Sequence, residues 1–181
     1  MVFLGIIWGP AFKYKNEILE DTKQFAKKTL SLDIDLGEKY SDFVYDMYKY
    51  EDMPKWKIDK KLEHMHSENN SSINVSFYDI DTSEEFYHPF KHCIVYKNVE
   101  GMKMFIREKY KGKVDDYFFD TVFHLTDNKV ELNHSVDVLN AYLNQAGKKD
   151  EVTCNILKNV IQFIVSQETQ RLLSSNESPQ M

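Results

Sequence analysis

The residues with the clearest chemical potential lie together in the segment His-Leu-Thr-Asp-Asn at positions 124–128. An unprotonated histidine is a nucleophile near neutral pH, and a hydroxyl and a carboxylate follow it closely enough to position it. Residues 117–125 are rich in aromatic and β-branched types, which predicts a largely buried strand. Asn128 and Glu131 have the spacing of a capping box, so a helix should begin there. We therefore expect His124 where a strand meets a helix N-terminus, a position whose free N–H groups and positive dipole end suit a phosphate.

Two interpretations of this junction follow from the residues alone. In the first, His124 is a nucleophile, the hydroxyl of Thr126 fixes its surroundings by a hydrogen bond, and Asp127 reaches a neighbouring loop. In the second, His124 is a packed or capping residue, and Thr126 and Asp127 only cap the helix. Composition and spacing leave both open.

The composition indicates a single compact domain with C-terminal additions, because 181 residues with 42% hydrophobic content can build one core. The net charge of −6 disfavours nucleic acid or an anionic membrane as the main partner, since either normally requires a positive surface. The apolar opening at 2–8 stops at Gly9-Pro10, which indicates a first strand rather than a signal peptide, and no apolar run has membrane-spanning length. With only two cysteines, we expect reduced thiols in a cytoplasmic protein.

The periodicity of apolar residues predicts the elements that position His124. Strands are expected at 2–8, 30–36, 73–77 and 117–125, with a possible short strand at 92–96. Helices are expected at 18–26, 40–48, 54–65, 99–110, 128–143 and 152–172. This order contains an α+β ferredoxin-like split βαβ sandwich, with a helix pair inserted after the second strand and extra helices at the C-terminus. We expect an α+β domain at 1–146, a helical extension at 147–173 and a flexible tail at 174–181.

Several short motifs fall in the same order as in nucleoside diphosphate kinases. The segment at 124–128 resembles that family's His-Gly-Ser-Asp-Ser, whose histidine carries the phosphoryl group. The family's first strand and first helix are resembled by Phe3 to Pro10 and by Asn16-Glu17-Ile18-Leu19. Its nucleotide-clamping helix pair is resembled by Tyr48, by Pro54-Lys55-Trp56 and by Met65-His66-Ser67. Its Ile-Arg step is resembled by Ile106-Arg107. The likeness spans residues 2–143.

The resemblance implies a nucleotide-binding phosphotransferase that moves the terminal phosphoryl group of ATP or another nucleoside triphosphate through a phosphohistidine at His124. It implies that Tyr48 and Trp56 line the base and ribose cleft, although helix packing would explain both as well. Arg107 would bind phosphate oxygens through its planar guanidinium, or be an exposed helix residue. Mg²⁺ would arrive with the nucleotide rather than in a dedicated cage. The family also implies a homo-oligomer.

The sequence departs from the family at positions near the histidine. Trp8-Gly9-Pro10 stands where the family has Lys-Pro, Leu125 replaces a glycine, and the family's histidine-orienting glutamate falls at Ser135. The alternative function is therefore an inactive nucleotide-sensing or protein-interaction module on the same fold, or a protein that uses its sheet or last helix for contacts alone.

Overall fold

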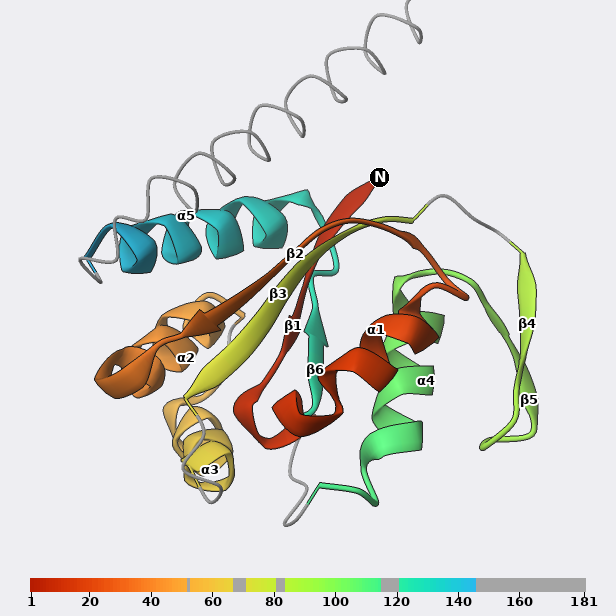
Figure 1. Cartoon of the computed structure of the whole chain (residues 1–181), viewed down its shortest axis with the longest axis horizontal. Helices are drawn as coiled ribbons and strands as arrows, with labels where there is room; N and C mark the ends of the chain where they lie inside the picture. Colours follow the sequence, from red (N-terminus) through yellow and green to blue (C-terminus); the bar gives the residue numbers. More distant parts are fainter. Residues whose placement is uncertain (52, 67–70, 81–83, 115–120, 146–181) are drawn as a thin grey trace, which may run out of the picture. The chain divides into compact units, whose positions relative to one another are not determined.

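The computed structural model describes residues 1–51, 53–66, 71–80, 84–114 and 121–145 (Figure 1). The chain forms two compact units, Met1–Leu139 and Asn140–Met181, and the architecture described below is that of the first. The domain boundaries predicted near 146 and 173, the helix expected at 152–172 and the tail lie outside the described residues. In the described part of the chain, no helix is long and apolar enough to cross a membrane.

The central feature is a four-stranded antiparallel sheet with the strand order β2-β3-β1-β6. Its strands are β1 (Val2–Ile7), β2 (Lys27–Asp35), β3 (Ser72–Asp79) and β6 (Phe123–Leu125). The helices are α1 (Lys15–Thr22), α2 (Tyr40–Tyr48), α3 (Lys55–His66), α4 (Val99–Tyr110) and α5 (Lys129–Gln145), with short 3-10 helices at Gly9–Tyr14 and Gly37–Lys39. Since α1 connects β1 to β2 and α4 connects β3 to β6, the predicted ferredoxin-like split βαβ fold is confirmed, with α2 and α3 inserted between β2 and β3.

The strand β1 lies inside the sheet, because it pairs with β3 on one side and with β6, the strand of His124, on the other. All its residues are buried, as the continuous apolar run predicted. Gly5 is required by packing, since a Cβ there would lie 2.7 Å from the ring of Tyr78. The pairing of Ile6 with His124 places the histidine beside the centre of the sheet.

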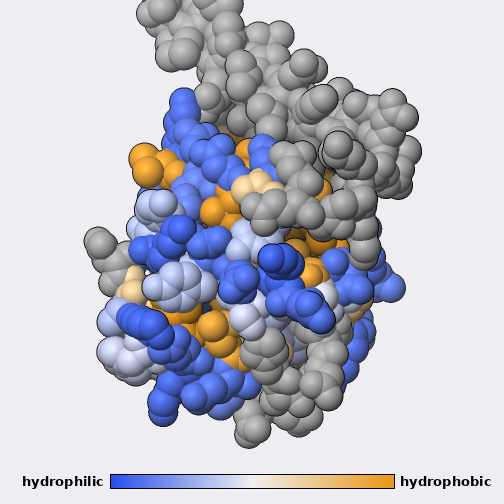
Figure 2. Space-filling view, turned by 90° about the vertical axis from the view of Figure 1, so that its left-hand side faces the viewer, coloured by the Kyte–Doolittle hydropathy of each residue, from blue (hydrophilic) through white to orange (hydrophobic). Residues whose placement is uncertain are grey.

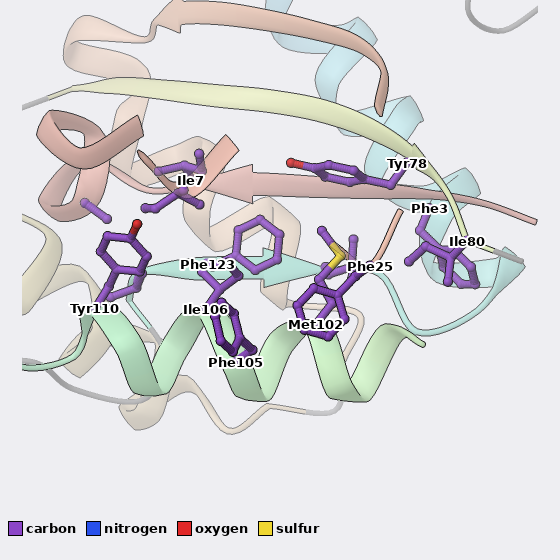
Figure 3. Close-up of a cluster of buried hydrophobic side chains, with 14 of the residues drawn as sticks. Phe3, Ile7, Phe25, Tyr78, Ile80, Met102, Phe105, Ile106, Tyr110 and Phe123 are labelled. Atoms are coloured by element: carbon purple, nitrogen blue, oxygen red, sulfur yellow. The ribbon is translucent and has the colours of Figure 1, made fainter. Parts of the chain in front are cut away.

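Alternation along β6 sends its side chains to two different layers. Phe123 and Leu125 join a hydrophobic core in which β1 and β3 meet α1 and α4. Figure 3 shows Phe123 facing Ile106 and Met102 of α4 in this core. His124 lies between them in sequence and therefore points to the opposite face, where α2, α3 and the start of α5 lie (Figure 1).

A polar contact ties α1 to α4 beside the core. Asp21 is buried and accepts hydrogen bonds from the ammonium of Lys109 at 2.7 Å and the hydroxyl of Tyr110 at 2.6 Å. Burial, followed by the hydrogen bond and the charge of Asp21, raises the pKa of Tyr110. This contact fixes α4, the helix whose Lys103 and Arg107 contact Asp127 and the carbonyl of Phe123, the residues on either side of the His124 segment.

A small hairpin of β4 (Glu85–His88) and β5 (Cys93–Tyr96) precedes α4. Phe86 packs against Phe25 and Phe105, which joins the hairpin to the core. The helix α4 follows so closely that a Cβ at Gly101 would lie 1.9 Å from the carbonyl oxygen of Tyr96. Only β5 of this hairpin was predicted.

The helices α2 and α3 are amphipathic, as their apolar spacing predicted. Phe43, Val44, Met47 and Tyr48 of α2 and Ile58 and Met65 of α3 are buried. On the side of the molecule shown in Figure 2, the described residues are mostly hydrophilic, with hydrophobic ones in small separate patches.

Candidate functional site

His124 occupies a buried position between aromatic rings and carboxylates. Its side chain is 7% exposed, and its Nε2 lies 3.4 Å from Oε1 of Glu131 and 3.9 Å from Oε1 of Glu51. The Nε2 atom has no hydrogen-bond partner. The ring of Tyr48 stands perpendicular to the imidazole at 5.6 Å, and Trp8 lies 6.5 Å from it.

Three positively charged side chains also act on the imidazole. Burial, together with the charges of Arg107, Lys103 and Lys61, lowers the pKa of His124 to about 3. Lys61 and Lys103 are themselves buried, with 4% and 6% exposure. The imidazole is therefore neutral at physiological pH, and a nitrogen lone pair lies in a positive environment.

The two carboxylates beside His124 interact with each other. Burial raises the pKa of Glu51 to about 8, and the charge of Glu131 and a hydrogen bond with it add to the rise, while Lys61 and Lys103 oppose it. Burial thus favours the protonated form of Glu51, which can donate a hydrogen bond to Glu131.

Glu131 reaches the site because it lies in the first turn of α5. Its N–H donates to Oδ1 of Asn128 at 3.0 Å, which confirms that half of the predicted capping box. The Oε2 atom of Glu131 accepts the N–H of Asp127 at 2.6 Å, rather than the N–H of Asn128. With Oε2 held in this way, Oε1 faces His124.

Thr126 and Asp127, the two other predicted catalytic residues, hold the chain after β6. The N–H of Leu4 donates to the hydroxyl of Thr126 at 3.0 Å, and the N–H of Thr126 donates to the carbonyl of Leu4 at 3.0 Å. Asp127 forms an ion pair with the buried Lys103. The cap itself is made by Asn128, so Asp127 takes the role of reaching a neighbouring element.

The three predicted nucleotide-binding residues lie in different surroundings. Tyr48 is buried against His124, and the ammonium of Lys61 lies 4.7 Å from the centre of its ring. Arg107 donates from Nε to the carbonyl of Phe123 at 3.0 Å, next to His124 in the chain. Trp56 is 59% exposed at the start of α3. The structure therefore groups Tyr48 and Arg107 with His124, and leaves the indole of Trp56 on the surface.

Sequence reasoning missed Glu51, Lys61 and Lys103. The two lysines had a signal, because each lies at helical spacing within a run of apolar residues, Ile58 to Met65 in α3 and Met102 to Ile106 in α4. A charged residue on such a face has to be buried with a partner. Glu51 follows the end of α2 and had no local signal.

Trp8, in the segment Trp8-Gly9-Pro10 that stands where the family has Lys-Pro, is fully buried, and its indole packs 5.8 Å from Tyr48. The nearby Lys15 pairs with Asp33. Ser135 is buried, while Glu131, one turn earlier on α5, faces the histidine. Glu131, rather than the residue at position 135, is therefore the residue of α5 that lies beside His124.

An open cleft of about 600 Å³ adjoins the carboxylates. It is lined by Tyr50, Glu51, Asp127, Asn128, Val130, Glu131 and His134. Solvent and small ligands can therefore approach Glu51 and Glu131 from the side away from the core.

No family model matches the sequence, and no curated protein matches it. The structure is similar to a nucleoside diphosphate kinase of Aquifex aeolicus, with 10% identity, a TM-score of 0.49, and 76% of this chain and 93% of that chain covered. It is also similar to a nucleoside diphosphate kinase family protein of Babesia bovis (9% identity, TM-score 0.45, 76% and 86% covered). A third similar structure is a transition-state mimic of the Borrelia burgdorferi enzyme with vanadate and ADP (12% identity, TM-score 0.46, 76% and 85% covered).

Proposed function

We propose that this protein is a nucleotide-binding phosphotransferase in which His124 accepts the terminal phosphoryl group of a nucleoside triphosphate. The observation that carries the proposal is the buried imidazole of His124 between Tyr48 and Glu131, with Lys103 and Arg107 contacting residues 127 and 123 on either side of it in the chain. Phosphoryl transfer needs a positioned nucleophile and positive charge at the phosphate oxygens, and this site supplies both. Mg²⁺ would arrive with the nucleotide.

The carboxylates fit a role in selecting the reactive nitrogen. If the proton is on Nε2, which lies 3.4 Å from Oε1 of Glu131, the lone pair is on Nδ1. In the proposed step, this lone pair attacks the γ-phosphorus, an N–P bond forms, and the bond to the β–γ bridging oxygen breaks. The nucleoside diphosphate leaves with that oxygen, and the proton stays on Nε2 opposite Glu131.

Lys61 and Lys103 would supply the charge that the family places after its first strand. Both are buried and both act on His124, whereas Lys15 is engaged with Asp33. Arg107 donates from Nε to the carbonyl of Phe123, which holds its guanidinium next to the strand that carries His124, and its planar guanidinium would bind phosphate oxygens.

A second candidate is a nucleotide-sensing module without turnover. It is favoured by the burial of His124, whose imidazole is 7% exposed and flanked by Trp8 and Tyr48. A phosphorus atom would have to approach past these rings.

The homo-oligomer and the cytoplasmic location remain predictions from the sequence and the family. Light scattering tests the homo-oligomer.

The deciding experiment is incubation with γ-labelled ATP and Mg²⁺, followed by treatment with acid or base. A phosphohistidine is labile in acid and stable in base. Label with this pattern in the wild-type protein and its loss in His124→Gln would support the phosphotransferase. An unlabelled protein that still binds nucleotide in calorimetry would favour the sensing module.

A further inference from the structure

The groups around Nε2 of His124 have a second possible use. Glu51, His124 and Glu131 each offer one ligand atom, and the three atoms lie within 4.8 Å of one another. They come from the end of α2, from β6 and from the first turn of α5, so the fold itself brings them together. We propose that these three residues form a binding site for a first-row divalent transition metal ion such as Zn²⁺.

The distances suit a tetrahedral ion. Two ligands at about 2.1 Å from a tetrahedral metal are about 3.4 Å apart. Nε2 of His124 lies 3.4 Å from the carboxylate of Glu131 and 3.9 Å from that of Glu51. Small rotations of the glutamate side chains would complete the geometry.

A separate observation points to a ligand at this place. Nε2 of His124 is buried and has no hydrogen-bond partner, although two carboxylate oxygens lie within 4 Å of it. Buried polar atoms are normally satisfied, and an unsatisfied one needs an explanation such as an ion. A metal ion between the imidazole and the carboxylates would satisfy it.

The donor set selects the kind of metal. One imidazole nitrogen with two carboxylates suits Zn²⁺, Mn²⁺ or Fe²⁺, whereas Mg²⁺ and Ca²⁺ prefer oxygen ligands alone. Three protein ligands leave one position open. Glu51 and Glu131 also line the open cleft, so a water molecule or an anionic group could take that position from there.

The surrounding charges have to be weighed against a cation. The imidazole feels the positive charges of Lys61, Lys103 and Arg107, and these charges disfavour a metal ion beside it. Lys103 is paired with Asp127, which offsets one of these charges. The carboxylate oxygens of Glu51 and Glu131 lie within 4 Å of Nε2 and would be the negative ligands of the ion, once Glu51 has given up its proton on binding it.

Metal binding would also control the phosphotransferase, and this consequence alone rests on the proposed function. A neutral imidazole that binds a metal through Nε2 carries its proton on Nδ1. The Nδ1 lone pair is then missing, and the metal-loaded protein cannot accept a phosphoryl group. The ion would therefore act as an inhibitor that binds Nε2, the ring nitrogen that does not attack the phosphorus.

The test is a titration of the full chain, free of any histidine tag and pretreated with a chelator, with Zn²⁺ against a chromophoric chelator. We expect one Zn²⁺ per chain, and no displacement of it by millimolar Mg²⁺. Glu51→Gln and Glu131→Gln should each weaken binding more than the 10- to 100-fold typical of losing an outer-shell partner. The exposed Glu63→Gln on α3 is the matched control and should bind as the wild type does.

Co²⁺ provides a second measurement that does not depend on activity. Bound to the wild-type site, it should give the visible absorption of a four-coordinate ion, and His124→Gln should remove it, while circular dichroism verifies that each variant is folded. The proposal is overturned if the wild-type protein takes up no stoichiometric Zn²⁺, or if folded Glu51→Gln and Glu131→Gln bind as tightly as the wild type. Labelling by ATP and Mg²⁺ is measured on the chelator-treated, zinc-free protein, so a protein that binds zinc but is not labelled in its zinc-free form rejects the phosphotransferase and keeps the metal site.

Discussion

Nε2 of His124 and Oε1 of Glu131 lie 3.4 Å apart, although one residue belongs to the last strand of the sheet and the other to the helix that follows. The segment between them is held at both sides, by Thr126 on Leu4 of β1 and by Asp127 on Lys103 of α4. The imidazole and the carboxylate therefore keep their relative position through contacts with two other elements.

Replacing His124 by Ala or Gln should abolish phosphohistidine formation. Nucleotide affinity should stay within about tenfold, or ~1.4 kcal/mol, because a nucleophile contributes more to the reaction than to ground-state binding. Labelling with γ-labelled ATP and calorimetry with ADP measure the two effects. Equal labelling of the wild type and the variants would reject His124 as the acceptor.

Replacing Lys103 by Met should weaken binding of ADP, because the substitution keeps the aliphatic stem and removes the buried charge. A lost charge-assisted contact with phosphate costs about 1.5–3 kcal/mol. Calorimetry measures the change, with Lys111→Met on the exposed end of α4 as the control. An affinity equal to that of the control would remove Lys103 from the phosphate site.

Gly101→Ala should destabilise the fold by roughly 1–3 kcal/mol, the range for an overpacked site. Its new Cβ would lie 1.9 Å from the carbonyl oxygen of Tyr96, a backbone atom that cannot move away without shifting the hairpin. Gly112→Ala is the matched control, since nothing lies within 4 Å of a Cβ there. Urea unfolding of both variants tests the prediction, and equal midpoints would contradict it.

Two buried tyrosines should make the protein less stable at high pH. Burial raises the pKa of Tyr40, and burial with Asp21 raises that of Tyr110, above the unfolded value of about 10. Above pH 10 the unfolded chain loses protons that the folded chain keeps, so unfolding becomes easier as the pH rises. The slope is at most about 1.4 kcal/mol per pH unit for each tyrosine.

Urea unfolding between pH 8 and 11 measures that slope. Tyr40→Phe should make it shallower, because the residue can no longer ionise in the unfolded chain. Tyr96→Phe changes an exposed ring and is the control. A Tyr40→Phe slope equal to that of the wild type would show that this phenol does not govern the loss.

Most of the fold could be predicted because its strands and helices have local patterns of apolar residues. The continuous apolar run of β1, the alternation along β2 and the helical spacing in α2 and α4 each followed from neighbouring residues. The strand β4 (Glu85–His88) was not predicted, because it is short and has no local pattern. It is stabilised by Phe86, which packs on Phe25 and Phe105 elsewhere in the chain. The helix α1 ends at Thr22 rather than near Ala26, because turns bring Phe25 into the core.

The site was only partly predictable for the same reason. The junction at His124 and the cap by Asn128 are local in sequence, and both were predicted. Glu51 and Lys61 reach His124 from the α2–α3 region, far away in the chain, so only the folded structure shows that they act on it. Trp56 matched a family position in sequence, yet its indole is exposed, because its place at the start of α3 turns it away from the buried face.

The two tryptophans differ in a way that gives the protein its own optical reporter. Trp8 is fully buried, 6.5 Å from the imidazole of His124, while Trp56 is 59% exposed. Iodide in solution should quench the emission of Trp56 and spare that of Trp8, so the remaining blue-shifted fluorescence comes from the indole beside the histidine. Any event that changes the charge or contacts of that imidazole can then be followed without an attached dye.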